Sequence, residues 1–242
     1  MIIMIFDRFG KNEDEEIISD EEFISRKEFK KLKRLINAHQ YHIENIQMFY
    51  NLEPTPLLRD MLDLSYEMLK FFDNVCRKYG IGYWLSDDTL LNAVRNGRLM
   101  AFSDEINVSV IQSDLMKLND ALASQIDDEG LDNLRYDHDA LEITLLCPEI
   151  EGKLIGIVIS AYDESQQIER NNLFPLSEIQ LGSYTFNVPS NPNDYLRQIN
   201  GKNYIRKISK VHDSSKLNRL KKQESILKEY ISMFRKANEN FE

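Results

Sequence analysis

The sequence predicts an α+β or α/β domain framed by helices at both ends. Long stretches near the two ends repeat apolar residues at three- and four-residue steps, which is typical of amphipathic helices. Between them lie short runs rich in β-branched and aromatic residues, punctuated by Gly and Pro, as expected for strands and turns. At 242 residues, the chain is long enough for one such domain with helical extensions.

The first 53 residues are predicted to form a helical N-terminal extension. Apolar residues from about 13 to 50 recur near helical spacing, and Pro54 and Pro56 then break the chain. A basic cluster in this stretch comprises Lys30, Lys31, Lys33 and Arg34. We interpret it as a solvated helix face in preference to a patch for anionic lipids.

The next elements follow in order from residue 54. The clearest helix covers 57–79, where apolar residues follow helical steps until Gly80. Two shorter helices are predicted at 89–96 and from the capping residue Ser113 to about 126. Strands are predicted at 81–85, 106–111, 140–146 and 153–161.

The last third of the chain is predicted to be less regular. Residues 173–208 should be mostly loop with short elements, because Pro175, Pro189, Pro192 and Gly201 punctuate them. A final amphipathic helix is predicted at 216–236, with Leu220, Leu227, Ile231 and Phe234 buried. We therefore expect three parts: the extension at 1–53, a central domain at 54–212, and a C-terminal helix at 213–242 packed on that domain.

Composition limits the partners and the cellular compartment that we expect for this protein. A formal net charge of -10 and a pI near 5.0 argue against nucleic acid, because an acidic surface repels phosphate backbones. A nucleotide stays compatible, since a metal ion or an arginine can neutralise its phosphates. Cys76 and Cys147 are predicted to be buried thiols, which favours a reducing, cytoplasmic compartment. The apolar run at 1–6 is too short to span a membrane, so we predict no transmembrane segment and only peripheral contact, at the inner membrane face.

Candidate chemistry is concentrated in the segment 83–108. Asp87 and Asp88 follow one predicted strand, while Asp104 and Glu105 precede the next. If these strands are neighbours in a sheet, their turns bring several carboxylates around one site. Mg²⁺ prefers oxygen ligands and commonly bridges carboxylates to a substrate phosphate. Glu105 and Asn107 are two residues apart, so on a strand both side chains share one face.

Structural interpretations of the same residues stay open. Acidic turn residues usually face solvent or cap helices, and Asp88 can cap a helix that begins at Thr89. Arg95 either binds a phosphate or pairs with Asp88 or Asp104. The aromatic residues Tyr83, Trp84 and Phe102 are interpreted as core residues.

The segment 83–108 resembles the signature of the LicD family, which also includes the fukutin-type proteins. The family pattern is a strand ending in Gly-Thr-Leu-Leu-Gly-Ala-x-Arg, followed by Pro-Trp-Asp-Asp-Asp-Ile-Asp-Ile. Matches to the first block are Thr89, Leu90, Leu91, Ala93, Val94 and Arg95. Matches to the second are Asp104 and Ile106, with Phe102 and Val108 replacing Trp and Ile. A C-terminal block is similar too: Leu173-Phe174-Pro175-Leu176, Val188-Pro189, Asp194-Tyr195-Leu196 and Gly201-x-x-Tyr204.

The resemblance covers about 57–212 and implies both a fold and an activity. The implied fold is α+β, a nucleotidyltransferase-like mixed β-sheet flanked by helices. The implied activity is Mg²⁺-dependent transfer of a phosphorylated substituent, such as phosphocholine, from a nucleotide-activated donor to a cell-surface glycan, such as lipopolysaccharide or teichoic acid. By position, the two metal ligands fall on Glu105 and Asn107, and Glu105 and Asp104 become the catalytic candidates. The substrate-binding candidates are Asp87, Asp88, Thr89 and Arg95.

Several positions depart from the family pattern. Glu105 keeps a charge on a longer arm, whereas Asn107 keeps an oxygen and loses the charge. The glycine that lets a donor phosphate approach is Asp88 here, and a negative side chain repels a phosphate. The second glycine is Asn92, and a third family carboxylate falls on Val158. Together these changes indicate reduced or lost activity.

Two hypotheses follow. In the first, the chain is a LicD-like phosphotransferase with a rearranged Mg²⁺ site built from Glu105, Asp104 and Asp87 or Asp88. In the second, it is a non-catalytic binding or scaffolding subunit, with a protein partner docked on the terminal helices. Fold residues such as Leu90, Leu91 and Ala93 are kept while the charged site residues are not, which favours the second.

Overall fold

The computed structural model describes residues 29–31, 55–99, 103–163, 168–206, 219–221 and 223–241. The chain divides into two compact units, Met1–Ile46 and Gln47–Glu242. In the first unit, residues 29–31 are helical, and the rest of the predicted N-terminal extension lies outside the described residues. All elements discussed below belong to the second unit, and the predicted boundaries at 53/54 and 212/213 stay predictions.

A five-stranded mixed sheet forms the centre of the second unit. Its strand order is β1-β2-β5-β4-β3, in which β2 and β5 are parallel and the other neighbours are antiparallel. A separate antiparallel hairpin is made by β6 and β7. The strands are β1 (Tyr83–Leu85), β2 (Glu105–Ile111), β3 (Leu134–Asp137), β4 (Glu142–Cys147), β5 (Gly152–Tyr162), β6 (Ser177–Leu181) and β7 (Tyr184–Val188).

Helices flank this sheet. The α-helices are α3 (Pro56–Tyr79), α4 (Asp87–Asn96), α5 (Leu115–Asp128), α6 (Arg170–Leu173), α7 (Pro192–Asn200) and α9 (Glu224–Glu239). Short 3₁₀ turns are η1 (Gln112–Asp114), η2 (Pro148–Ile150) and η3 (Tyr204–Arg206). The predicted α+β class, with a mixed sheet and flanking helices, is confirmed.

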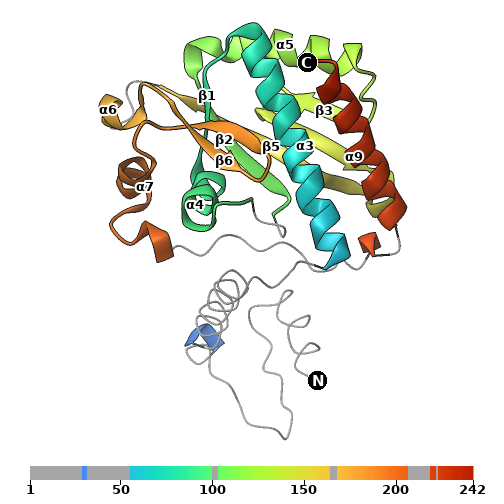
Figure 1. Cartoon of the computed structure of the whole chain (residues 1–242), viewed down its shortest axis with the longest axis horizontal. Coiled ribbons are helices and arrows are strands. Elements are labelled where there is room, and N and C mark those ends of the chain that lie inside the picture. The colour runs from blue at the N-terminus through green and yellow to red at the C-terminus, as the bar shows by residue number, and fades with distance from the viewer. Residues whose placement is uncertain are drawn as a thin grey trace, which may run out of the picture. The chain divides into compact units, whose positions relative to one another are not determined.

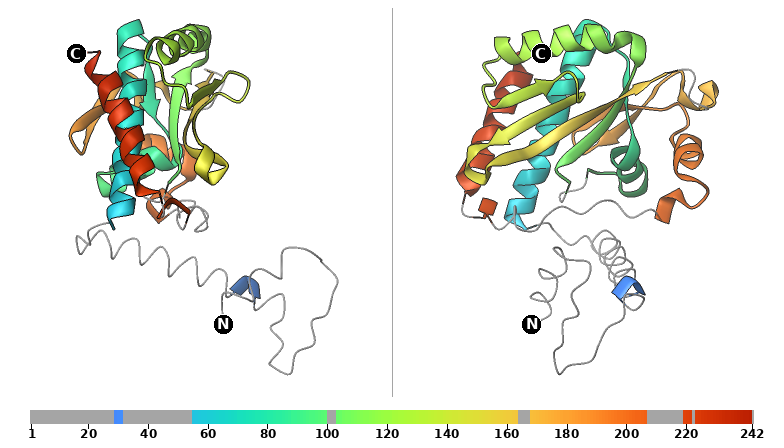
Figure 2. Two further views of the ribbon diagram at one scale, coloured as in Figure 1. Left: turned by 90° about the vertical axis from the view of Figure 1, so that its right-hand side faces the viewer. Right: turned by 180° about the vertical axis from the view of Figure 1, so that it is seen from behind.

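The two faces of the sheet are covered differently. Helices α3 and α9 lie side by side across one face (Figure 1), whereas the view from behind shows most of the opposite face without a described helix over it (Figure 2). The covered face carries the apolar residues of the central strands, among them Ile106, Val108, Ile157 and Ile143, all buried. Alternation along β2 therefore turns the polar residues Glu105 and Asn107 toward the other face.

The long helix α3 begins and ends on clear sequence signals. Thr55 is its N-cap, and its Oγ1 accepts a hydrogen bond from the Leu58 N–H. Pro56 occupies the first turn, where a missing N–H costs nothing. Gly80 ends the helix in the left-handed conformation, with φ 60°, which other residues rarely adopt.

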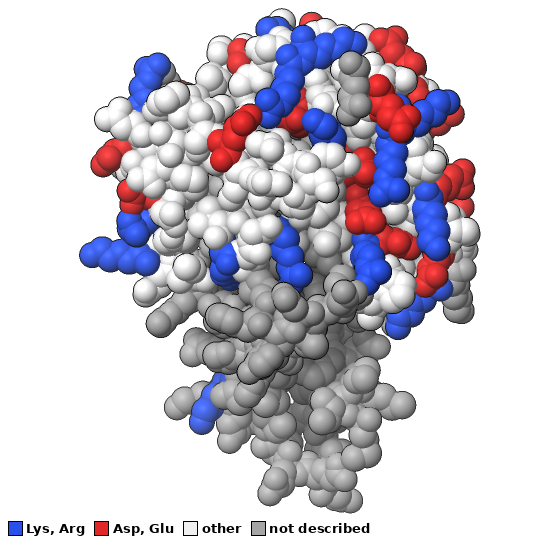
Figure 3. Space-filling view, viewed as in Figure 1, with Lys and Arg blue, Asp and Glu red and all other residues white. Residues whose placement is uncertain are grey.

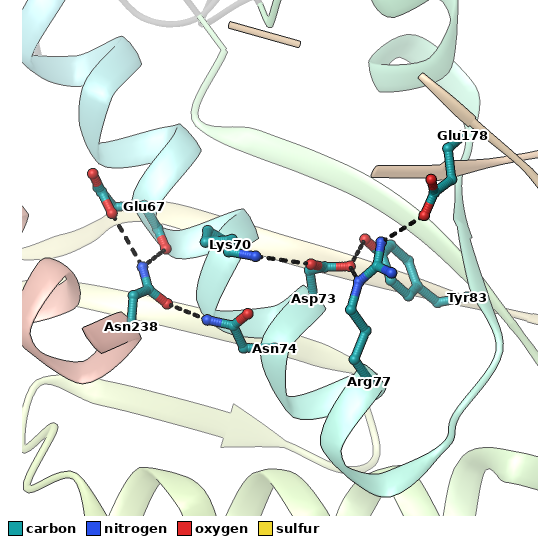
Figure 4. A network of polar contacts seen from close by, with 8 residues as sticks. All are labelled: Glu67, Lys70, Asp73, Asn74, Arg77, Tyr83, Glu178 and Asn238. Atoms are coloured by element: carbon teal, nitrogen blue, oxygen red, sulfur yellow. Dashed lines mark hydrogen bonds and ion pairs between the residues drawn. The ribbon is translucent and has the colours of Figure 1, made fainter. Parts of the chain in front are cut away.

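Two buried carboxylates of α3 join it to its neighbours (Figure 4). Asp73 accepts from the Tyr83 hydroxyl of β1 at 2.8 Å and from the Arg77 Nε at 2.8 Å. Glu67 accepts from the Asn238 Nδ2 of α9 at 3.1 Å. Outside the residues drawn in the figure, the Tyr184 hydroxyl of β7 also donates to Glu67, at 2.9 Å. A buried charge is tolerated when it is paired and hydrogen-bonded in this way.

The structure differs from the predicted elements at several points. Ser113 lies inside the turn η1, and α5 begins two residues later, at Leu115, so its predicted capping role was wrong. Strand β3 was not predicted. Residues 173–208 were predicted to be mostly loop with short elements, but they contain the β6–β7 hairpin. The final helix runs from Glu224 to Glu239, later than predicted.

Predictions about the core fared better. Leu220, Leu227, Ile231 and Phe234 are buried as predicted, and so are the two cysteine thiols and the rings of Tyr83 and Trp84. Phe102 lies outside the described residues. None of the helices in the described part of the chain is both long enough and apolar enough to cross a membrane. Basic and acidic side chains are interspersed on the right-hand side of the α3–α9 face, so their charges offset one another there (Figure 3).

Candidate functional site

The two acidic turns predicted from the sequence lie next to each other. Strand β1 pairs antiparallel with β2, so the end of β1 is beside the beginning of β2. Two hydrogen bonds hold this junction: the Ser86 N–H donates to the Asn107 carbonyl oxygen at 3.0 Å, and the Asn107 N–H donates to the Thr89 Oγ1 at 2.7 Å. Thr89, a substrate-binding candidate, therefore fastens α4 to β2 through its hydroxyl.

The other candidates in α4 lie along its first and last turns. Asp87 has φ 44°, an uncommon conformation for a residue with a side chain. Asp88 lies inside the first turn and Ser86 is the N-cap residue, so the capping role considered for Asp88 was wrong. In the last turn, the Arg95 Nη2 donates to the Asn92 Oδ1 at 2.9 Å, and its Nη1 donates to the Ile205 carbonyl oxygen at 3.4 Å.

The register of the central strands brings together the three positions to which the resemblance assigns metal ligands. Glu105 and Asn107 lie two apart on β2, and Asn107 is the direct partner of Val158 on the parallel strand β5. Paired residues of neighbouring strands point to the same side of a sheet. The partly buried carboxylate of Glu105, the amide of Asn107 and the isopropyl group of Val158 thus lie next to one another. They lie on the sheet face that α3 and α9 do not cover (Figure 1 and Figure 2).

Glu105 is already engaged by a lysine that the sequence did not single out. The Lys153 Nζ lies 3.2 Å from the Glu105 Oε1 and 2.6 Å from the Glu142 Oε1 of β4. All three side chains are largely shielded, with 26%, 35% and 25% of their surface exposed for Lys153, Glu105 and Glu142. Burial alone would lower the pKa of Lys153, but the hydrogen bonds and ion pairs with Glu142 and Glu105 outweigh it and raise that pKa above its usual value.

A strand irregularity places Lys153 on this face. Between the pairs Leu145–Ile155 and Leu146–Lys153, strand β5 contains one extra residue, Leu154. Such a bulge interrupts the alternation of side chains, so that Leu154 and Ile155 are both buried while Lys153 reaches the polar side. In a regular strand, a residue three positions before Gly156 would point to the opposite face.

A second group of contacts involves the C-terminal block. The Trp84 Nε1 donates to the buried Tyr195 hydroxyl of α7 at 3.1 Å, and the Trp84 ring meets Tyr162 and Phe174 edge to face. Burial raises the pKa of Tyr195, and the nearby charge of Asp87 adds to that effect. Tyr195, the tyrosine of the C-terminal block, is therefore a buried packing residue near the Asp87 turn.

The side chains of Glu105, Asn107 and Val158 are a poor chemical match for Mg²⁺. That ion is held by one or two carboxylates in near-octahedral oxygen coordination. Here the single carboxylate of the set, Glu105, is ion-paired with Lys153, and Val158 offers no donor atom. Within the described ranges, no three His, Cys, Asp or Glu side chains are grouped so that they could hold a metal ion.

Comparison with known families agrees with this architecture. The family model described as LicD/FKTN/FKRP, nucleotidyltransferase domain, matches residues 80–191, which run from the end of α3 to the residue before α7. Residues 80–191 are therefore assigned to the LicD/FKTN/FKRP nucleotidyltransferase domain, and the resemblance found in the sequence is confirmed there. A search of curated proteins found no relative that matches this chain.

Proposed function

We propose that the chain is a LicD-like protein of cell-surface glycan modification with reduced or lost transfer activity. The ancestral reaction would move a phosphorylated substituent, such as phosphocholine, from a nucleotide-activated donor to a glycan such as lipopolysaccharide or teichoic acid. Family membership supports this ancestry. The observation that argues against full activity is the set Glu105, Asn107 and Val158, which lie at adjacent points of β2 and β5 and contain one carboxylate.

The loss of charge at this set bears directly on phosphoryl transfer. Catalysis of this kind depends on cations that neutralise the charge developing on the transferred group. Replacing two acidic ligands by Asn107 and Val158 removes the charge that attracts a divalent cation. Asp88 adds a negative side chain at the position where the family places a glycine beside the donor phosphate.

The alternative role is that of a non-catalytic binding or scaffolding subunit. Leu90, Leu91 and Ala93 of α4 are buried, so the residues that the chain shares with the family pattern there serve packing. Helix α9 buries Leu227, Ile231 and Phe234 and leaves a charged outer side. That outer side is the surface on which we would place a protein partner.

One observation favours the opposite possibility, a rearranged active enzyme. The turn containing Asp87 and Asp88 adjoins the beginning of β2, where Asp104 and Glu105 lie. These four carboxylates could hold Mg²⁺ in a geometry that differs from that of the family, with Arg95 binding a donor phosphate. On this reading, exchange of Glu105 for Ala abolishes Mg²⁺-dependent nucleotide binding.

Calorimetric titration of the protein with CDP-choline and related nucleotides, with and without Mg²⁺, separates these possibilities. We expect no Mg²⁺-dependent binding at millimolar nucleotide concentrations, and the same result for the variant Glu105→Ala. Binding that needs Mg²⁺ and is lost in Glu105→Ala would contradict the proposal and support the rearranged enzyme.

A further inference from the structure

Lys153 occupies the space between two carboxylates that come from different strands. Its Nζ is 2.6 Å from Glu142 on β4 and 3.2 Å from Glu105 on β2, whereas Lys153 itself belongs to β5, the strand between them. A single cationic group thus bridges two carboxylates across three adjacent strands. This is the same electrostatic arrangement as a metal ion shared by two acidic ligands.

Two features of strand β5 keep the Lys153 side chain in this position. The bulge at Leu154 turns the Lys153 side chain toward the polar face. Gly156, the direct partner of Glu105, leaves room for the other members: a Cβ at this position would be 2.6 Å from the Glu142 Oε1 and 3.3 Å from the Lys153 Cδ. A side chain at 156 would therefore require the Glu142 carboxylate to shift from its present position.

We propose that the Lys153 ammonium group is a built-in counter-ion that takes the place of a divalent cation between Glu105 and Glu142. This inference rests on the proposed function. It explains why Glu105 and Glu142 need no Mg²⁺ to balance their negative charges. Its consequence is specific: without the ammonium group, Glu105 and Glu142 become two unpaired neighbouring carboxylates. Two such carboxylates, completed by water, are a sufficient anchor for a divalent cation.

Electron paramagnetic resonance of added Mn²⁺ tests this inference, because the signal of free Mn²⁺ falls when the ion binds. We expect the wild type to bind Mn²⁺ weakly, and Lys153→Ala to bind it about tenfold more tightly or better. Lys117→Ala is the matched control, since Lys117 contacts the Gly80 carbonyl oxygen at 3.4 Å and bridges no carboxylates in the described structure. The control should bind Mn²⁺ like the wild type.

Two further proteins complete the design. In Lys153→Ala combined with Glu142→Gln, the gained affinity should disappear if both carboxylates hold the ion. The inference is overturned if Lys153→Ala gains no affinity, or if the wild type already binds Mn²⁺ tightly and loses it in Glu105→Gln. Lys153→Gln, which removes the charge and keeps most of the side-chain stem, replaces Lys153→Ala if that variant fails to fold, and the same gain in Mn²⁺ affinity is expected.

The outcomes distinguish this inference from the proposed function. Mn²⁺ binding is measured without nucleotide, so tight wild-type binding through Glu105 refutes the counter-ion whether or not a donor is bound. Conversely, Mg²⁺-dependent nucleotide binding that is retained in Glu105→Gln would refute the proposed function and leave the counter-ion standing.

Discussion

At the scale of single residues, the polar groups discussed above divide into those that stabilise the fold and those that lie at the candidate site. Asp73 and Glu67 belong to the first kind: both are buried in α3 and hydrogen-bonded to other elements. Glu105 belongs to the second kind, since it is partly exposed and paired with Lys153. The two kinds are expected to respond differently to mutation.

Asp73→Ala should lower the free energy of unfolding by about 1–3 kcal/mol, because the buried Tyr83 hydroxyl loses its acceptor. Arg77 and Lys70 also lose their partner, but their side chains are 46% and 26% exposed, and water compensates them in part. Chemical denaturation measures the change. Asp73→Asn, which keeps an acceptor oxygen, should cost less; equal losses for both variants would show that the hydrogen bond does not matter.

At the scale of elements, the sequence predicted those helices and strands that have a clear pattern of apolar residues along the chain. The helical spacing from Leu57 to Gly80 and the β-branched runs at 106–111 and 153–161 correspond to α3, β2 and β5. The missed strand β3 is only four residues long, and two of them are exposed, so it carries little periodicity. The hairpin β6–β7 lies between prolines, which favoured a loop prediction.

The candidate site was predictable only where neighbours in sequence determine it. Glu105 and Asn107 share a face because they are two apart on one strand, and the family pattern pointed to Val158 as the third position. Glu142 and Lys153 were not predicted as members, because their place depends on pairing between β4 and β5 and on a bulge in that pairing. No periodicity in a single strand reveals such a shift of register.

Gly156→Ala tests whether the space beside Gly156 is needed for the Glu142–Lys153 ion pair. The added methyl group would lie 2.6 Å from the Glu142 Oε1 and 3.2 Å from the Ile143 carbonyl oxygen. We expect the Glu142 carboxylate to move away from Lys153, and the free energy of unfolding to fall by about 1–2 kcal/mol. Gly152→Ala is the control, because a Cβ there has no atom within 4 Å. Equal stability of the two variants in chemical denaturation would contradict the tight packing of this ion pair.

At the scale of the whole molecule, we propose that the fold of the matched domain is kept while the chemistry at the candidate site has changed. The mixed sheet and its flanking helices agree with the matched nucleotidyltransferase domain at 80–191. What differs is the charge on one sheet face, where a lysine and two glutamates lie beside an asparagine and a valine. We therefore expect that substitutions on this sheet face can change metal affinity without a matching change in the free energy of unfolding.

Two tyrosines predict how stability changes in alkaline solution. Burial, followed by the hydrogen bond to Glu67, raises the pKa of Tyr184 to about 12, and burial raises that of Tyr230 to about 12 as well. An unfolded tyrosine ionises near pH 10. The folded protein keeps these hydroxyls protonated longer, so their stabilising contribution is complete below pH ~10 and is lost as the pH rises through ~12.

Urea unfolding of the wild type and of Tyr184→Phe at several pH values measures this loss for one residue. The variant lacks the hydroxyl that donates to Glu67, so it should be less stable at neutral pH. We expect the stability difference between the two proteins to shrink between pH ~10 and ~12. A difference that stays constant over this interval would mean that the folded protein does not protect the Tyr184 hydroxyl.

The most direct test of the altered site is thermal unfolding of the wild-type protein with and without millimolar Mg²⁺, in the presence of a panel of nucleotide-activated donors. A ligand that binds only the folded state raises the unfolding temperature. We predict that Mg²⁺ adds no stabilisation for any donor, because Glu105 is paired with Lys153 and because Asn107 and Val158 carry no charge. A Mg²⁺-dependent rise in unfolding temperature that disappears in Glu105→Ala would contradict this conclusion.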